Sequence, residues 1–274
     1  MAPRIMGILN VTPDSFSDGG EWFDFDEAVA HGRLLVSEGA DILDVGGEST
    51  RPGADAVPLE EELRRVLPVV EGLAGAGAAI SIDTSKAAVA AAALDAGASY
   101  VNDVTAFRGD PALAGLVAER GVECCLMHML GEPRTMQQDP RYDDVVSDVK
   151  AFLEQRLAFA VGEGVSEERV TLDPGIGFGK ALEQNLELLR RLDEIAAIGR
   201  PVLVGTSRKS FLGGLTGREV DDRLAGTIAT NVLAYARGAS VFRVHDVGPV
   251  RDALTVAAAT VAAPWTSPTA TTKS

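Results

Sequence analysis

The sequence has few cysteines and few positive charges. Cys124 and Cys125, the only cysteines among 274 residues, are adjacent, which excludes a disulfide framework and any spacing suited to zinc. In the strand that we expect over residues 122–127, they point to opposite faces and are small buried core residues. Lys and Arg total 25 against 40 Asp and Glu, a net charge of −15. This charge argues against binding to nucleic acid or to an anionic membrane, because both are themselves negative.

Long apolar runs and an export signal are also lacking. No apolar stretch has the length needed to cross a bilayer. The N-terminal residues do not follow the basic, apolar and small-residue order of a signal peptide. We therefore expect a cytoplasmic protein with no membrane partner. No pair among the three histidines has metal-ligand spacing, so we expect no tight transition-metal site.

What the sequence does contain is a recurring apolar, β-prone run that ends in a polar residue. Examples are Ile5–Leu9 before Asn10 and Ile80–Ile82 before Asp83. Eight such strands are expected, each followed by a helix-like stretch: Ile5–Leu9, Ile42–Val45, Ala79–Ile82, Tyr100–Val101, Cys124–Met127, Val170–Leu172, Val202–Val204 and Val241–Val244. Alternating strands and helices predict an α/β fold with a parallel sheet, and eight units predict a closed (β/α)8 TIM barrel. An open doubly wound sheet is the alternative.

Apolar periodicity predicts the helices between these strands. Two sets of residues each share one helical face: Leu59, Leu63, Val66, Val70 and Leu73, and Leu182, Leu186, Leu189, Leu192 and Ile195. Pro68 is expected to kink or divide the first of these helices. A longer amphipathic helix is expected over Asp143–Val161. We predict one barrel domain over residues 1–263 and a disordered tail over 264–274, which is rich in Ser, Thr, Pro and Ala.

Acidic and amide side chains end three of the expected strands. These are Asp83, Asn102 with Asp103, and Asp173. In a parallel barrel the C-terminal strand ends form the rim that carries the active site. Together the three positions could bind a flat heterocycle rich in N–H donors, such as a guanine-like edge. Helix capping is the alternative for any one of them, most of all for Asp83, which Thr84 and Ser85 follow.

Cations gather after the last two strands. Gly205–Ser210 includes Lys209, and Arg243 and His245 lie two apart on an extended segment, so they face the same side. The Gly-rich segment Gly46–Gly53 adds Arg51, whose guanidinium suits phosphate or carboxylate. A single cation is usually a solvated surface charge, but a cluster at strand ends favours an anion site. The expected ligand has a planar donor-rich end and a phosphorylated end.

The loop Asp173–Lys180 has neither Walker A nor dinucleotide-binding glycine spacing. Its aromatic residue, Phe178, either covers a bound ring or simply packs.

Six segments resemble the dihydropteroate synthase family. They are Gly7–Gly20, Asp44–Gly53, Ser81–Thr84, Asp173–Lys180, Ser207–Ser210 and Arg243–Asp246, and the resemblance extends from Ile5 to about Val261. It implies an eight-stranded barrel that forms a homodimer. It also implies condensation of 6-hydroxymethyl-7,8-dihydropterin diphosphate with 4-aminobenzoate, giving 7,8-dihydropteroate and pyrophosphate.

The resemblance assigns roles to individual residues. The pterin is held by Asp83, Asn102, Asp173 and Lys209, lined by Met127, Phe178 and Gly205, and stacked on by Arg243. The diphosphate is bound by Asn10, Thr50, Arg51, Arg243 and His245, with Mg²⁺ near Asn10. The aminobenzoate site is formed by Ser207 with Phe16, Asp18, Arg51 and Pro52. Asp18 is expected to help close the first loop, which follows the first strand. The residues expected to carry catalysis are Asp18, Arg51, Asp173, Lys209, Arg243 and His245.

The charges predict that diphosphate departs before the amine attacks, because the electron-rich dihydropterin can delocalise the resulting cation. Three other functions are weighed. A pterin-binding methyltransferase shares the barrel but has no use for the diphosphate residues. A barrel aldolase would use Lys209 as a Schiff-base amine. A catalytically silent pterin-binding homologue would be free to lose the loops that follow the first and second strands. Both loops are intact here, which argues against this alternative.

Overall fold

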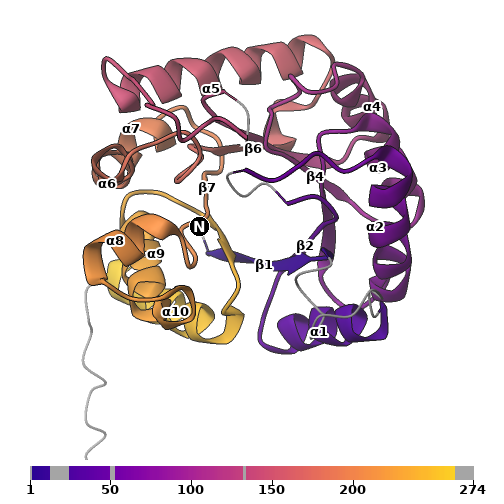
Figure 1. Ribbon diagram of the computed structural model, residues 1–274, viewed down its shortest axis with the longest axis horizontal. Helices are drawn as coiled ribbons and strands as arrows, with labels where there is room; N and C mark the ends of the chain where they lie inside the picture. The colour runs from indigo at the N-terminus through magenta and orange to yellow at the C-terminus, as the bar shows by residue number, and fades with distance from the viewer. Residues whose placement is uncertain (1, 13–24, 50–52, 132–133, 263–274) are drawn as a thin grey trace, which may run out of the picture.

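The computed structural model describes residues 2–12, 25–49, 53–131 and 134–262 (Figure 1). The strands are β1 (Arg4–Asn10), β2 (Ile42–Gly46), β3 (Ala79–Asp83), β4 (Tyr100–Asp103), β5 (Glu123–Met127), β6 (Val170–Asp173), β7 (Leu203–Val204) and β8 (Val241–Val244). The α-helices are α1 (Phe25–Ser37), α2 (Leu59–Leu73), α3 (Ala87–Asp95), α4 (Ala112–Arg120), α5 (Val145–Gly162), α6 (Leu182–Arg190), α7 (Leu192–Ala196), α8 (Ser210–Thr216), α9 (Leu224–Ala236) and α10 (Val247–Ala262). Short 3₁₀ helices occur at η2 (Glu167–Arg169) and η3 (Val220–Asp222).

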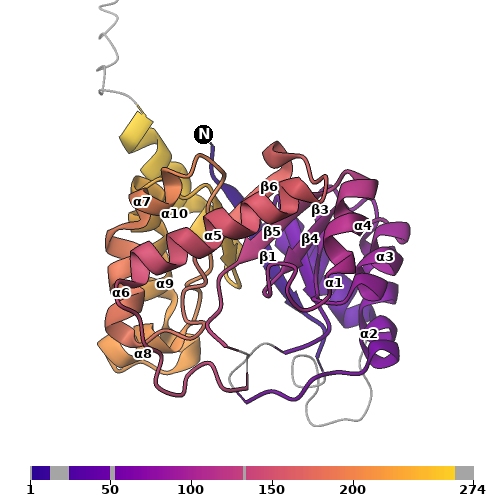
Figure 2. The ribbon, with the colours of Figure 1, turned by 90° about the horizontal axis from the view of Figure 1, so that it is seen from above.

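The described strands form one parallel sheet that closes into a barrel. Its order is β6-β5-β4-β3-β2-β1-β8-β7, and a bridge between Leu172 and Val202 joins β6 to the start of β7. The Leu172 N–H donates to the Pro201 carbonyl at 2.9 Å at this junction. The helices surround the strands, as Figures 1 and 2 show from two directions. The predicted (β/α)8 barrel is confirmed, and the open sheet is excluded.

Successive side chains of each strand point alternately into the barrel and toward the helices, so the core has an inner and an outer part. The lower barrel interior is filled by Met6, Ile42, Tyr100, Cys125, Leu203 and Val241. The residues between them, such as Leu43 and Cys124, face the helices and belong to the larger outer core. The prediction that Cys124 and Cys125 are buried on opposite faces is confirmed. The same alternation determines which polar residues turn inward farther along each strand.

Pro68 does not divide its helix. Helix α2 runs without interruption from Leu59 to Leu73, so the expectation of a division was wrong. Pro68 is exposed, while Val66, Val69 and Val70 face the core. The carbonyl that loses its hydrogen-bond donor four residues earlier, at Arg64, is also on an exposed residue, so water can replace the missing partner.

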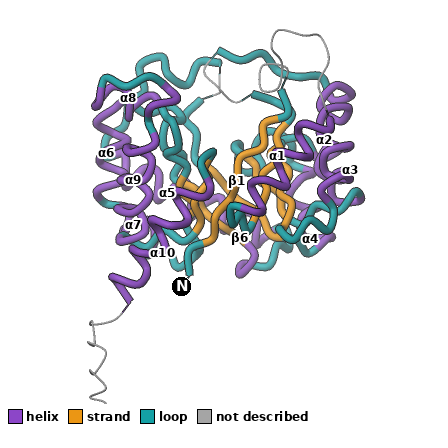
Figure 3. Tube along the Cα trace, turned by 90° about the horizontal axis from the view of Figure 1, so that it is seen from below, coloured by secondary structure: helices purple, strands orange, loops and turns teal. Residues whose placement is uncertain are grey.

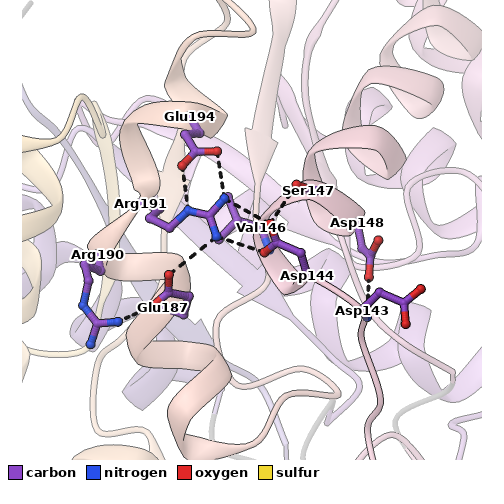
Figure 4. A network of polar contacts seen from close by, with 9 residues as sticks. All are labelled: Asp143, Asp144, Val146, Ser147, Asp148, Glu187, Arg190, Arg191 and Glu194. Atoms are coloured by element: carbon purple, nitrogen blue, oxygen red, sulfur yellow. Dashed lines mark hydrogen bonds and ion pairs between the residues drawn. The ribbon is translucent and has the colours of Figure 1, made fainter.

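The second apolar face predicted from periodicity spans two helices. Arg191 lies between α6 and α7 as the C-cap of the first and the N-cap of the second, with φ −113° and ψ 30°. Its guanidinium bonds both carboxylate oxygens of Asp144 at 3.0 and 3.1 Å, and Glu194 at 2.6 Å (Figure 4). Asp144 in turn caps α5 by accepting from the Val146 N–H. This network fixes the break at the point where α5 meets α6 and α7.

Among the described helices, none combines the length and the apolar character required to cross a membrane. The described loops after the strands gather on the side of the barrel away from the N-terminus, where Figure 3 shows them in teal above the orange strands. The candidate site lies on this side.

Candidate active site

The strand pleat brings polar side chains from different strands to the inside of the rim. Asp44 follows the interior residue Ile42 by two positions, and Asn102 follows Tyr100 in the same way. Arg243 likewise follows Val241 on β8. Above an apolar lower layer, the barrel interior therefore becomes polar toward its C-terminal end.

Arg243 lies at the centre of a buried network. Its Nε donates to Oδ2 of Asp44 at 2.6 Å, and its Nη2 donates to Oδ2 of Asp83 at 2.7 Å. The fully buried Asp44 also accepts from the Ser81 hydroxyl at 2.6 Å and from the Asn102 amide at 3.0 Å. Asp44 therefore orients Arg243 and Asn102 together, a role that the sequence reasoning missed.

Charge and burial shift the pKa values in this network. Burial, followed by the charge of Asp44, raises the pKa of Asp83, and Arg243 opposes this shift. Burial would lower the pKa of Arg243, but the carboxylates of Asp44 and Asp83 outweigh it and raise that pKa. The guanidinium thus stays charged, while Asp83 retains a proton more readily than an exposed aspartate does.

A second group joins β6 to the loop before α8. Asp173 accepts from the Gly175 N–H at 2.7 Å; burial raises its pKa, and the charge of Lys209 opposes this rise. Burial lowers the pKa of Lys209 to about 8, with Asp173 opposing. The Lys209 ammonium donates to the Ile176 carbonyl and lies 4.5 Å from the centre of the Phe178 ring. These neighbouring residues form an acceptor, a cation and an aromatic cover.

Ser207 and His245 connect the ends of β7 and β8. The Ser207 hydroxyl lies 3.0 Å from Nδ1 of His245, and the His245 N–H donates to that hydroxyl at 3.2 Å. Arg208, which lies between Ser207 and Lys209, has a φ of 58° and donates to Asp246 at 2.7 Å. Arg208 is therefore engaged in an ion pair and, unlike its neighbours Ser207 and Lys209, does not line the cavity between these strand ends.

Two neighbouring cavities open among these residues. The smaller, about 70 Å³, is lined by Ile8, Asn102, Val104, Met127, Asp173, Phe178, Gly205, Ser207, Lys209, Arg243 and His245. The larger, about 260 Å³, is lined by Glu48, Ser49, Ala54, Ala56, Glu62, Asp83, Thr84, Ser85, Val104, Thr105 and Arg134. Val104 borders both. Nine of the residues singled out from the sequence thus line the smaller cavity. Asp83 does not line it but bonds Arg243, which does.

Asn10 ends β1 beside this site. It is partly exposed and lies two positions after Ile8, which lines the smaller cavity, so both residues face the same side. Its amide oxygen is of the type that Mg²⁺ prefers, and Mg²⁺ commonly keeps waters and phosphate oxygens as its other ligands. The residue present is therefore compatible with the expected metal. Asp18, Thr50 and Arg51, together with Phe16 and Pro52, lie outside the described residues.

Two alternatives at the strand ends are settled by geometry. Asp83 is not the helix cap, because α3 begins at Ala87, whose N–H is bound by Asp110 at 3.0 Å. Asp103 points away from Asn102 and accepts from the N–H groups of Thr105 and Phe107 at 2.7 and 2.6 Å. Asp103 thus stabilises a turn, and Asn102 alone faces the cavity.

Sequence reasoning also missed three buried polar residues, of which Glu62 lines the larger cavity and Lys180 and His128 line neither cavity. Glu62 of α2 is fully buried, accepts from Thr84 at 2.7 Å and pairs with Lys86. Lys180 and His128 are buried against each other behind Asp173. The position of Glu62, one turn before the buried Val66, is the sequence signal that could have revealed it.

Comparison with known proteins relates the chain to one family. The family described as pterin binding enzyme matches residues 6–245. The chain is 47% identical to the dihydropteroate synthase of Escherichia coli K12 over 262 residues, covering 95% of this chain and 93% of that protein. It is 52% identical over 243 residues to a probable bifunctional folylpolyglutamate synthase/dihydropteroate synthase of Haloferax volcanii. That match covers 89% of this chain but only 29% of the longer relative.

Solved structures agree over nearly the whole chain. Dihydropteroate synthase of Xanthomonas albilineans with 4-aminobenzoic acid has a TM-score of 0.90 and 51% identity, covering 96% of this chain and 94% of that one. The same enzyme with 7,8-dihydropteroate has a TM-score of 0.86 and 48% identity, covering 96% and 95%. A Yersinia pestis dihydropteroate synthase with a sulfonamide drug has a TM-score of 0.91 and 44% identity, covering 96% and 95%.

Proposed function

The chain belongs to the pterin-binding enzyme family, and from this premise we infer that it catalyses the dihydropteroate synthase reaction of folate biosynthesis. It joins 6-hydroxymethyl-7,8-dihydropterin diphosphate to 4-aminobenzoate and releases pyrophosphate. The observation that carries this conclusion is the 47% identity to the Escherichia coli enzyme over almost the full length of both chains. The second activity of the longer Haloferax relative is not transferred, because most of that protein has no counterpart here.

We propose that the pterin occupies the smaller cavity. Asp173 and Asn102 face it and would pair with the amino and ring N–H groups of the heterocycle, with Asp83 close by through Arg243. Lys209 would donate to a ring acceptor, while Met127, Phe178 and Gly205 line the pocket. Buried acceptors of this kind discriminate against rings that lack the donors, because the acceptors would then be left unpaired.

The diphosphate would lie toward the C-terminal ends of β8 and β2. Arg243 and His245 supply the cationic side of the smaller cavity, and Asp44 orients the guanidinium at 2.6 Å. The additional roles of Thr50 and Arg51 remain predictions from the family resemblance. A fixed cation next to the leaving group stabilises charge that builds in the transition state without having to reorganise.

Mg²⁺ is proposed as the metal of this site, with Asn10 as its protein ligand. When bound, the ion would neutralise charge on the diphosphate. Asn10 would contribute its amide oxygen from the strand end, and the substrate and water would supply the remaining oxygens. The support is the donor type of Asn10 and its position on the same side of β1 as Ile8.

We propose that bond breaking precedes bond formation. The methylene C–O bond breaks and its electron pair leaves with the diphosphate, while the dihydropterin ring delocalises the cation that remains. Asp173 beside the ring favours this electron-poor state, and Arg243 with His245 stabilises the departing anion. The arylamine lone pair then forms the C–N bond, and the nitrogen releases its extra proton. No protein nucleophile is needed.

The second substrate, 4-aminobenzoate, would bind next to Ser207, at the mouth of the pterin cavity. Phe16, Asp18, Arg51 and Pro52 are proposed to complete this site. Asp18 would order the first loop, so Asp18→Ala should lower turnover and weaken the requirement for 4-aminobenzoate. Full turnover with an unchanged requirement would show that Asp18 has no such role.

A homodimer is proposed through the side formed by α8, α9 and α10. Leu215, Val220, Leu233 and Val256 are large apolar side chains on this side and are 47–66% exposed. The neighbouring packing of α8 on α9 and of α9 on α10 places them on adjoining elements. Sedimentation equilibrium should give a dimer for the wild type and a monomer for Leu233→Asp with Val256→Asp. A cytoplasmic location remains a prediction from the sequence.

The direct test measures pyrophosphate release from the dihydropterin diphosphate, with and without 4-aminobenzoate and Mg²⁺. We expect release to depend on both additions and dihydropteroate to form in equal amount. Asp173→Asn is the matched inactive control, since it keeps the shape of the side chain and removes its charge. Release that is not stimulated by the arylamine would contradict the synthase activity.

A further inference from the structure

The loop after β6 is held almost entirely by side chains. It has no regular secondary structure, yet each carbonyl from Gly175 to Lys180 accepts a side-chain hydrogen bond. The donors are Lys180 for Gly175 and Phe178, Lys209 for Ile176, Gln137 for Gly177, Tyr142 for Gly179 and Asn185 for Lys180. One side chain, Lys180, therefore fixes two carbonyls three residues apart.

Lys180 is buried, with only 2% of its surface exposed. Its Nζ lies 2.9 Å from each of three groups, the Gly175 carbonyl, the Phe178 carbonyl and Nδ1 of His128, and 3.4 Å from the His128 carbonyl. The three shorter contacts match the three N–H bonds of an ammonium group. Burial lowers the pKa of Lys180 well below its usual value, and the charge of Asp173 opposes this shift. The three short contacts hold the buried amino group far more rigidly than a surface lysine is held.

His128 supplies the contacts of Lys180 that lie outside the loop, through Nδ1 at 2.9 Å and its carbonyl at 3.4 Å. Burial, followed by the charge of Lys180, lowers the pKa of His128 to about 2, so the ring is neutral and Nδ1 can accept. The ring packs edge-on against Phe152 with centroids 4.8 Å apart. The His128 N–H donates to the Asp173 carbonyl at 2.9 Å, extending the pairing of β5 with β6. His128 thus anchors Lys180 to the barrel.

The same loop carries the aromatic residue and contacts the cation of the pterin pocket. Phe178 lines the smaller cavity, and the Lys209 ammonium both bonds Ile176 and lies over the Phe178 ring. Packing is tight, since a Cβ at Gly177 would lie 2.9 Å from Cδ of Lys209. A shift of the loop must therefore move Phe178 or Lys209.

We propose that Lys180, oriented by His128, is a positioning residue that holds Phe178 and Lys209 in place for the pterin ring. This proposal rests on the proposed function for the identity of the ligand. Lys180 is not a catalytic residue, because it does not line the cavity and acts only through the loop carbonyls. Its removal should weaken binding of the pterin and leave the aminobenzoate side largely unaffected.

The test compares Lys180→Met with two nearly isosteric changes at His128. His128→Asn keeps an acceptor near the Nδ1 position, whereas His128→Leu removes it. The readouts are the Kd for 6-hydroxymethylpterin and the KM for each substrate. We expect Lys180→Met and His128→Leu to raise the pterin Kd by about tenfold, equivalent to about 1.4 kcal/mol. The KM for 4-aminobenzoate should change little, and His128→Asn should restore pterin binding.

Two results would overturn the proposal. One is wild-type pterin binding by folded Lys180→Met. The other is an equal loss in His128→Asn and His128→Leu, which would mean that the acceptor does not matter. If Lys180→Met does not fold, the pair at His128 decides the question. A wild-type protein that binds 6-hydroxymethylpterin but forms no dihydropteroate would contradict the proposed function and leave this inference standing.

Discussion

The Nε atom of Arg243 lies 2.6 Å from Oδ2 of Asp44, although 199 positions separate the two residues in the sequence. Strand β1 pairs with both β2 and β8, so barrel closure brings the first and last parts of the chain together. Asp44 is fully buried and has three donors around it. The geometry of the anion site thus depends on a residue that touches neither cavity.

Asp44→Asn should lower kcat/KM for the dihydropterin diphosphate by about tenfold, because the ion pair with Arg243 becomes a weaker hydrogen bond from the guanidinium to a neutral amide oxygen. Steady-state kinetics with saturating 4-aminobenzoate measure the effect. Ser81→Ala is the control: it removes a neutral donor from the same carboxylate, and we expect a smaller loss. Equal losses in the two variants would show that Asp44 does not act through Arg243.

Asp83→Asn should stabilise the protein above about pH 4 while weakening pterin binding. Because folding raises the pKa of Asp83, the folded state binds more protons than the unfolded state, and its stability falls as pH rises above the usual aspartate range. At pH 8 the variant should be more stable by on the order of 1 kcal/mol. Urea unfolding at pH 5 and pH 8 measures this. The exposed Asp252→Asn, with the same change in charge, should show no such gain.

Activity should fall on the alkaline side as Lys209 loses its proton. Burial lowers the pKa of Lys209 to about 8, so its ammonium is lost as pH rises through that value. The pH profile of kcat/KM reports groups of the free enzyme. Asp173, whose pKa is raised by burial from the usual aspartate range, acts on the acid side. Lys209→Arg should shift the alkaline fall to higher pH, and an unchanged alkaline limb would assign it to another group.

Removal of Mg²⁺ with EDTA should abolish pyrophosphate release, and added Mg²⁺ should restore it. Asn10→Ala should raise the Mg²⁺ concentration for half-maximal activity by about tenfold, while Asn10→Asp, which keeps an oxygen ligand, should not. Titration of activity with Mg²⁺ measures both. The Kd for 6-hydroxymethylpterin, which has no diphosphate, should be the same in Asn10→Ala and wild type. A parallel loss of pterin binding would mean that Asn10 contacts the ring.

Gly175→Ala should be among the most destabilising glycine changes in the described chain. Gly175 has a φ of +66°, and an added Cβ would lie 1.9 Å from the His128 carbonyl oxygen. We expect a loss of about 3 kcal/mol or more from steric overlap and backbone strain together. Gly199 has a φ of +91° but open space around it, so Gly199→Ala should lose only about 1 kcal/mol. Urea unfolding of the two variants separates the cost of steric overlap from the cost of backbone strain.

Much of the fold could be predicted because the signals are local. The expected strand Ile5–Leu9 lies within β1, and the expected helix Asp143–Val161 corresponds to α5 with its ends shifted by one or two residues. The division expected at Pro68 does not occur, because the carbonyl that loses its donor lies at the solvent-exposed side of α2. The break at Arg191 was missed because it depends on Asp144, a residue 47 positions away.

The sequence by itself determined which residues reach the rim, since strand alternation and the order of strands and helices are local properties of the chain. Tertiary structure alone decided which of them meet. Arg243 contacts Asp44 and Asp83, and Lys180 contacts His128, because the barrel fold places these partners within hydrogen-bond distance. Burial increases the free energy that depends on each contact, since a buried charge without a partner is strongly unfavourable. Distance and burial are three-dimensional quantities, and no spacing along the chain encodes them.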